Sequence, residues 1–157
     1  MSLFSFFKKK NKIEEDLNKK YLSISGKRYD ENDILELNEV YEIFKKYQGY
    51  EKVIDLTNGD IVREKVNSLM SELVDFGILC KNYDEFNDLY NNYKEFPLDK
   101  ISDLDIIGCM VLITSIQRSD YWFGNSSNIY LGYTKNGLIP KIIYRVINLY
   151  ESRVKQV

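Results

Sequence analysis

Apolar residues recur along this chain mostly at the three- and four-residue spacing of one helix face. The clearest stripe consists of Val62, Val66, Leu69, Leu73 and Phe76. Their spacing places all five side chains on one side of a helix. Gly77 follows directly, and a glycine at this position predicts a left-handed cap that ends the helix.

The same spacing, in weaker stripes, predicts further helices. They are Ile13–Leu22, Asp33–Tyr47, Asp84–Tyr93 and a last helix with Pro140 in its first turn. A shorter helix or an irregular stretch is expected at about Ser126–Lys135. Asp30 or Asn32 can cap Asp33–Tyr47, because a short polar side chain accepts the free N–H groups of a first turn. Between the helices, Ser23–Tyr29 is predicted to be a loop and Lys52–Leu56 a short β-like segment.

The run of residues 104–116 is apolar at nearly every position. A helix that is apolar on all sides belongs at the centre of a bundle. We expect this helix to begin at Ser102, with Asp105 completing a variant of the capping box. A buried strand is the alternative for this run, because β-branched residues recur in it.

Together these elements predict an all-α or mostly α fold, a single-domain helical bundle of about six helices. The helical domain is expected to span residues 13–157, after a basic and aromatic N-terminal segment of residues 1–12. The chain has 157 residues, 44% of them hydrophobic, so it can build one core without disulfides or metals.

The order of residues at the N-terminus does not match a secretory signal. Its aromatic residues precede its lysines, whereas a signal peptide carries positive charge before a longer apolar stretch. The longest apolar run, Ile106–Ile116, is about half of what a bilayer span requires. We therefore expect a cytoplasmic protein without stable membrane insertion. Cys80 and Cys109 are expected to be buried thiols, because each lies beside an apolar residue.

The composition argues against several kinds of activity. The chain contains no histidine, which removes the commonest general base, metal ligand and activator of a nucleophile. Its glycines are scattered and form no phosphate-binding loop. The isoelectric point of about 5.3 disfavours a nucleic-acid partner. We therefore expect no catalysis, no cofactor and no metal site.

Charge is unevenly distributed along the chain. Residues 30–100 contain 17 acidic and eight basic residues, whereas the rest of the chain contains seven acidic and 14 basic residues. An acidic surface accelerates association with a basic partner. Within the acidic block, carboxylates alternate with aromatic rings, which are common at protein interfaces. The predicted partner-binding residues are Tyr83, Asp84, Glu85, Asp88 and Tyr90.

The segment Arg118–Phe123 is the second unusual feature. It combines Arg118 and Asp120 with three adjacent aromatic residues, directly after the most apolar run. We interpret it as a structural corner, in which the charged residues pair with each other or with the backbone and the aromatic rings fill a gap. The alternative is a small-ligand or catalytic pocket lined by Trp122 and Phe123.

This C-terminal half resembles a family of bacterial proteins of uncharacterised function. Members of that family carry an apolar helix ending in Arg-x-Asp-Arg-Phe, then Gly-x-Ile and a final helix. Arg118 and Asp120 match the first two charged positions, Trp122 stands in place of the Phe, and Gly137 begins the later motif. Tyr121 departs from the second Arg. The resemblance covers about Val66–Tyr150 and implies structural roles for these residues but no activity.

The chain also resembles, in style, bacterial immunity proteins such as those of contact-dependent inhibition systems. The resemblance lies in the opening Met-Ser-Leu-Phe-Ser-Phe-Phe-Lys-Lys-Lys and in a small acidic chain rich in Tyr, Asn and Ile. It implies a cytoplasmic inhibitor of a cognate toxin domain, often a basic nuclease. The alternatives are another protein-interaction or scaffold role, and a small-ligand binder or enzyme that uses the Arg118–Phe123 segment.

Overall fold

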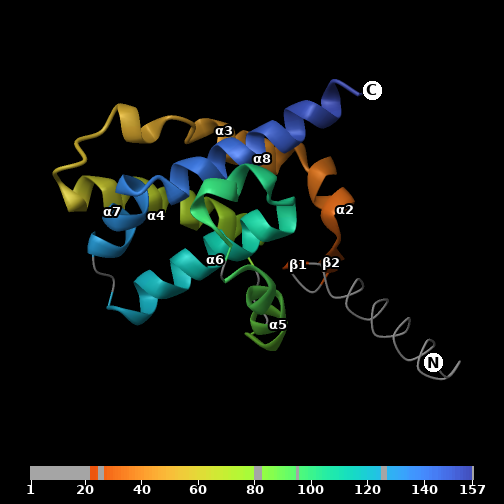
Figure 1. The fold of residues 1–157 in the computed structure, drawn as a ribbon, viewed down its shortest axis with the longest axis horizontal. Coiled ribbons are helices and arrows are strands. Elements are labelled where there is room, and N and C mark those ends of the chain that lie inside the picture. Colours follow the sequence, from red (N-terminus) through yellow and green to blue (C-terminus); the bar gives the residue numbers. More distant parts are fainter. Residues whose placement is uncertain (1–21, 25–26, 80–82, 95, 125–126, 157) are drawn as a thin grey trace, which may run out of the picture.

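The structure, a computed structural model, describes residues 22–24, 27–79, 83–94, 96–124 and 127–156 (Figure 1). These residues form seven α-helices, two short 3-10 helices and two three-residue strands. The prediction of a mostly helical single domain is therefore confirmed. The predicted N-terminal segment 1–12 and the predicted helix Ile13–Leu22 lie outside the described residues, except for Leu22.

The segment predicted to be a loop contains two short strands. β1 (Leu22–Ile24) and β2 (Lys27–Tyr29) pair antiparallel, with Leu22 opposite Tyr29. Leu22 is completely buried, so this hairpin is attached to the domain by an apolar side chain. The loop prediction for Ser23–Tyr29 is wrong because it followed the local sequence and overlooked this tertiary contact.

The helix predicted for Asp33–Tyr47 is divided into two. α2 (Glu31–Glu36) is capped by Asp30, and α3 (Asn38–Lys46) follows after the extended residue Leu37. The Tyr150 hydroxyl donates to the carbonyl oxygens of Ile34 and Leu37. These two carbonyls also accept the N–H groups of Leu37 and Val40, three residues further on. The Tyr150 hydroxyl thus adds a donor at the point where the regular bonding of a continuous helix is interrupted.

The β-like segment predicted for Lys52–Leu56 is also wrong, because a 3-10 turn, η1 (Tyr50–Lys52), begins this region. Tyr50 is buried, and its hydroxyl lies 2.6 Å from the Thr134 hydroxyl, which fixes the turn from the far side. The next helix, α4 (Gly59–Phe76), is capped by Asn58 and ends at Gly77 with φ +82°. The predicted left-handed cap is confirmed.

α5 (Tyr83–Tyr93) and η2 (Leu98–Asp103) lead to the central helix, α6 (Ile106–Trp122). The helix does not begin at Ser102, which lies in η2. Its cap is Asp105, whose Oδ1 accepts the N–H of Gly108 at 2.7 Å. The alternative of a buried strand is wrong, because the apolar run is helical from Ile106 onward. The run has no polar face because neighbouring elements cover α6 on several sides.

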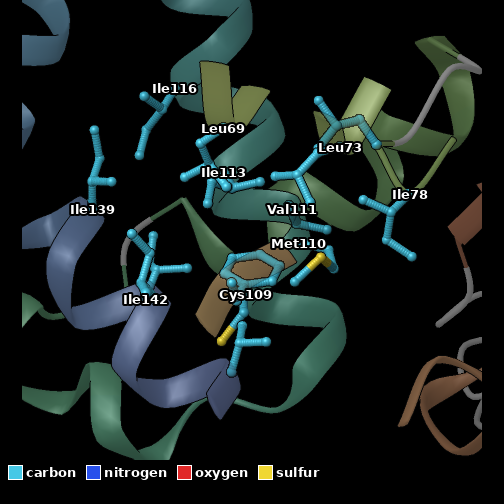
Figure 2. Close-up of a cluster of buried hydrophobic side chains, with 14 of the residues drawn as sticks. Leu69, Leu73, Ile78, Cys109, Met110, Val111, Ile113, Ile116, Ile139 and Ile142 are labelled. Atoms are coloured by element: carbon cyan, nitrogen blue, oxygen red, sulfur yellow. The ribbon is translucent and has the colours of Figure 1, made fainter. Parts of the chain in front are cut away.

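The remaining helices are α7 (Ser127–Lys135) and α8 (Leu138–Val154), with Pro140 in the first turn of α8 as predicted. α8 packs against both α3 and α6, while α4 packs against α7 (Figure 1). Figure 2 shows the side chains that meet in the core: Leu69 and Leu73 from α4, Met110 and Ile113 from α6, and Ile142 from α8.

α5 approaches the beginning of α6 closely. The Tyr93 hydroxyl donates to the Asp105 carboxylate at 3.0 Å. Gly108 makes this approach possible, because a Cβ atom there would lie 2.6 Å from a ring carbon of Tyr93. The cap of α6 and its contact with α5 are therefore one structural joint.

Cys109 is completely buried, as predicted, and burial raises the pKa of its thiol. Cys80 lies outside the described residues. Within the described part of the chain, none of the helices is both long enough and apolar enough to cross a membrane.

Candidate functional site

The five predicted partner-binding residues all lie on α5. Asp84 and Asp88 are exposed, and Tyr90 is half-buried with its ring stacked on that of Phe86 at 5.5 Å between centroids. The side chains of Tyr83 and Glu85 lie outside the part that the structure describes. α5 therefore presents at least two carboxylates beside a partly exposed aromatic ring.

Arg118 connects α5 with the C-terminal part of α6. Its guanidinium lies 4.0 Å from the centroid of the Phe86 ring, a cation–π contact. Trp122 follows Arg118 by four residues on α6, so both lie on the same side of that helix. The contact thus packs Arg118 against α5, one helical turn before Trp122.

Asp120 pairs with a residue that the sequence did not indicate. Its Oδ2 accepts from the Arg63 guanidinium of α4 at 3.2 Å, and 3% of the Asp120 side chain is exposed. Asp120 Oδ1 and Arg63 Nε are both buried without a hydrogen-bond partner among the described residues. Removing a charge from water is costly unless its hydrogen-bonding groups are satisfied. Among the residues that the structure describes, the hydrogen-bonding groups of this ion pair are therefore only partly satisfied.

A hollow beside α4, which we call the α4 groove, opens next to this ion pair. Its smaller part has a volume of about 190 Å³, and its wall includes Asn67, Asp75, Gln117, Asp120, Tyr121 and Tyr130. Its larger part, of about 490 Å³, shares Asn67 and Ser71 with the smaller part. The hollow exists because short polar side chains occupy this face of α4 where longer ones would fill it.

The α4 groove is acidic. Its walls carry the carboxylates of Asp60, Glu64, Asp75 and Asp120, and the guanidinium of Arg63. The hydroxyl of Tyr130 stays protonated near neutral pH, because burial, and secondarily the charge of Asp120, raise its pKa. The balance of charge therefore favours a cationic ligand over an anionic one.

The three aromatic residues after Asp120 form an exposed corner, which we call the aromatic tip. Tyr121, Trp122 and Phe123 are 70%, 77% and 71% exposed. The interpretation that these rings fill a gap is wrong, and such exposure also rules out an enclosed pocket lined by Trp122 and Phe123. The rings point outward because α6 ends here, beyond the elements that bury its middle.

Gly137 lies between α7 and α8. It adopts φ +84°, the left-handed region that favours glycine, and forms the N-cap of α8. It therefore turns the chain from α7 into α8, with Ile139 buried directly after it.

A second hollow, of about 460 Å³, lies between α3 and α8. Its carboxylate Glu151 already accepts from Lys45 Nζ and from the Tyr41 hydroxyl, both at 3.1 Å. These contacts lower the pKa of Glu151 and raise that of Lys45. Both donors bind the same oxygen of Glu151, and 40% of this side chain is exposed, so its other oxygen is not shut off from water as that of Asp120 is.

Sequence reasoning missed the α4 groove, although one signal was present. Polar residues recur on α4 at Asp60, Glu64, Asn67, Ser71 and Asp75 with the spacing of a single helix face. That face was open to interpretation as ordinary solvated surface. Only the approach of α6 and α7 turns it into the wall of a hollow.

Among the described residues, no group of three or more Cys, Asp or Glu side chains is arranged to hold a metal ion. No family model, curated protein or solved structure matches the chain. The resemblances seen in the sequence therefore remain predictions, and function has to be argued from the site.

Proposed function

We propose that this chain is a non-catalytic protein-binding domain, with the aromatic tip at the centre of its interface. The observation that carries the proposal is the exposure of three adjacent large rings, Tyr121–Phe123, at one corner. Contiguous exposed apolar surface marks interaction sites, and Trp and Tyr dominate the energetics of interfaces. Each such ring buries roughly 150–250 Å² when it is covered.

The surroundings of the aromatic tip indicate a basic partner. Asp75 lies on the α4 side, where it lines the groove together with Tyr121. Asp84 and Asp88 are exposed on α5, which Arg118 connects to α6. Carboxylates around an aromatic centre repel acidic proteins and accelerate association with basic ones.

An immunity protein that neutralises a toxin domain is the specific role that we propose. Toxins that cleave nucleic acids need a basic cleft, and an acidic surface with aromatic anchors complements such a cleft. A cytoplasmic location follows from this role, because the inhibitor has to act where the toxin does. The partner is then a protein, in keeping with the low isoelectric point of the chain.

The test is titration calorimetry with the C-terminal domain of the protein encoded immediately upstream, at low and at high salt. We expect tight binding that weakens as salt screens the carboxylates. Trp122→Ala should raise the dissociation constant by about 30-fold, the effect of a typical interface hot spot. Val53→Ala is the matched control, because Val53 is 81% exposed on another part of the surface.

Charge reversal measures how much the carboxylates of α5 contribute to the association rate. Asp84→Lys with Asp88→Lys should slow association by about tenfold at low salt, whereas Asp99→Lys with Asp103→Lys in η2 should not. Absence of binding at micromolar concentrations would remove the toxin partner. Tight binding that is unaffected by Trp122→Ala would move the interface away from the aromatic tip.

A further inference from the structure

We propose that the α4 groove receives an arginine side chain of the partner, which hydrogen-bonds to the Asp120 oxygen that has no donor among the described residues. This inference rests on the proposed function, since the arginine belongs to the bound protein. It adds a specific chemistry: the aromatic tip supplies contact area, and the groove next to it recognises one guanidinium group.

Asp120 supplies the main observation. Its side chain is 97% buried and lines the smaller part of the groove. Oδ2 accepts from Arg63, whereas Oδ1 has no hydrogen-bond donor among the described residues. An ionised carboxylate accepts about four hydrogen bonds, so Asp120, which lines the hollow, has acceptor capacity that the described residues do not use.

The walls of the groove favour a cation. Besides Asp120, the smaller part contains the carboxylate of Asp75, and the adjoining part contains Asp60 and Glu64. Arg63 balances one of these charges and is already committed to Asp120. A positively charged group that enters the groove is therefore attracted, and a phosphate or carboxylate is repelled.

The other walls favour arginine over lysine. The amide groups of Asn67 and Gln117 and the hydroxyl of Ser71 offer acceptors around the hollow, and Tyr121 contributes an aromatic side chain to its wall. A guanidinium carries five N–H donors and a flat face that stacks on aromatic rings, whereas an ammonium has three donors and no flat face. Several acceptors beside an aromatic ring therefore match the guanidinium better.

The experiment uses the full chain and a capped tripeptide, acetyl-Gly-Arg-Gly-amide, as the probe. Binding is followed by NMR through the side-chain amides of Asn67 and Gln117, and by the fluorescence of Trp122, the single tryptophan. We expect a dissociation constant of about 1 mM, as for one isolated charged contact. The citrulline analogue, equal in size but uncharged, should bind about tenfold more weakly.

Two variants locate the peptide. Asp120→Asn keeps the shape of the side chain, removes its charge and should weaken binding by about tenfold. Ser71→Phe fills the groove without changing the ion pair and should abolish binding, which decides the question if Asp120→Asn does not fold. Asp103→Asn, on the surface of η2, is the control and should bind like the unchanged chain.

Equal binding of the arginine and citrulline peptides would overturn the inference, and so would unchanged binding to Ser71→Phe. The proposed function fails separately. If the toxin domain binds through Trp122 but the arginine peptide does not bind, the arginine site alone is wrong. If the peptide binds in the groove and the toxin domain does not bind, the toxin partner is wrong and the groove remains a guanidinium site.

Discussion

Each end of α6 contains an aspartate close to a buried tyrosine, but the two carboxylates differ in the hydrogen-bond donors that surround them. Asp105, at the N-terminus, accepts from the Gly108 N–H at 2.7 Å and from the Tyr93 hydroxyl at 3.0 Å. It also lies at the positive end of the helix dipole, where a negative charge is stabilised. This end has the features of a structural joint.

Asp120, in the last turn, has the opposite surroundings. It faces the negative end of the helix dipole, and only one of its oxygens has a donor among the described residues. It is nevertheless almost completely buried, beside a hollow and an exposed aromatic corner. Among the described residues, the hydrogen bonding of Asp105 is thus complete, whereas one oxygen of Asp120 has no donor, and this is the oxygen that we propose binds the partner.

The largest effect should come from breaking the pair at the C-terminal end. Arg63→Met leaves the Asp120 carboxylate buried without its cation. We expect the free energy of unfolding to fall by about 3 kcal/mol, the low end for a buried pair, because a quarter of the Arg63 side chain is exposed. Urea denaturation measures the change.

Adding Asp120→Leu to Arg63→Met should restore stability to within about 1 kcal/mol of the original chain, because an apolar pair of similar size carries no desolvation penalty. If the double variant is as unstable as Arg63→Met alone, the Arg63–Asp120 pair itself stabilises the fold, as Asp105 does at the other end of α6. The comparison between the two ends would then fail.

The joint at the N-terminal end should be the next most sensitive. Asp105→Ala removes the cap of α6 and the acceptor for the Tyr93 hydroxyl, so we expect a loss of about 2 kcal/mol in urea denaturation. Asp105→Ser retains a capping oxygen and should recover about half of this loss. Equal stability of the Ala and Ser variants would show that capping contributes nothing here.

Close packing at the same joint gives the third prediction. Gly108→Ala places a Cβ atom 2.6 Å from the Tyr93 ring and should destabilise the chain by about 1.5 kcal/mol, despite the higher helix propensity of Ala. Gly132→Ala, in α7, is the control because no atom lies within 4 Å of its added Cβ. Thermal unfolding should show it stabilised, by about 0.5–1 kcal/mol.

Alkaline pH should weaken both ends of α6. Burial raises the pKa of the Tyr93 and Tyr130 hydroxyls, and the charges of Asp105 and Asp120 add to the effect. The folded chain therefore keeps protons that the unfolded chain loses near pH 10. This stabilisation is complete below pH 10 and is lost as the pH rises toward the folded pKa.

Between pH 10 and 11, each of these tyrosines should account for about 1 kcal/mol of the decline in stability. Tyr93→Phe and Tyr130→Phe should each flatten the alkaline branch of the stability curve by that amount, in denaturation measured at several pH values. An unchanged slope in either variant would show that its hydroxyl titrates alike in the folded and unfolded chains.

Local signals in the sequence were sufficient for α4. A stripe of apolar residues buried together, an Asn cap and a terminal Gly77 all lie within one segment, so neighbours along the chain decide where the helix begins and ends. The break at Leu37 was not predictable in this way. The Tyr150 hydroxyl, which donates to the Leu37 carbonyl at this break, lies 113 residues further along the chain.

The start of α6 was only partly predictable from the sequence. Ser102 and Asp105 both have capping chemistry, and a local pattern cannot choose between them. The structure selects Asp105, where Tyr93 and the close approach at Gly108 add to the cap. Packing between α5 and α6 thus decided a boundary that propensity left open.

For the candidate site, the sequence determined which chemistry is present: no histidine, an acidic middle and three adjacent aromatic residues. It also determined the mostly helical fold, because apolar periodicity and caps act between near neighbours along the chain. Only the tertiary structure decided that Arg63 and Asp120, 57 residues apart, form a buried pair, that a hollow opens beside them, and that the aromatic tip is exposed. The physical reason is that exposure and ion pairing depend on which helices pack together, and that is a property of the whole chain.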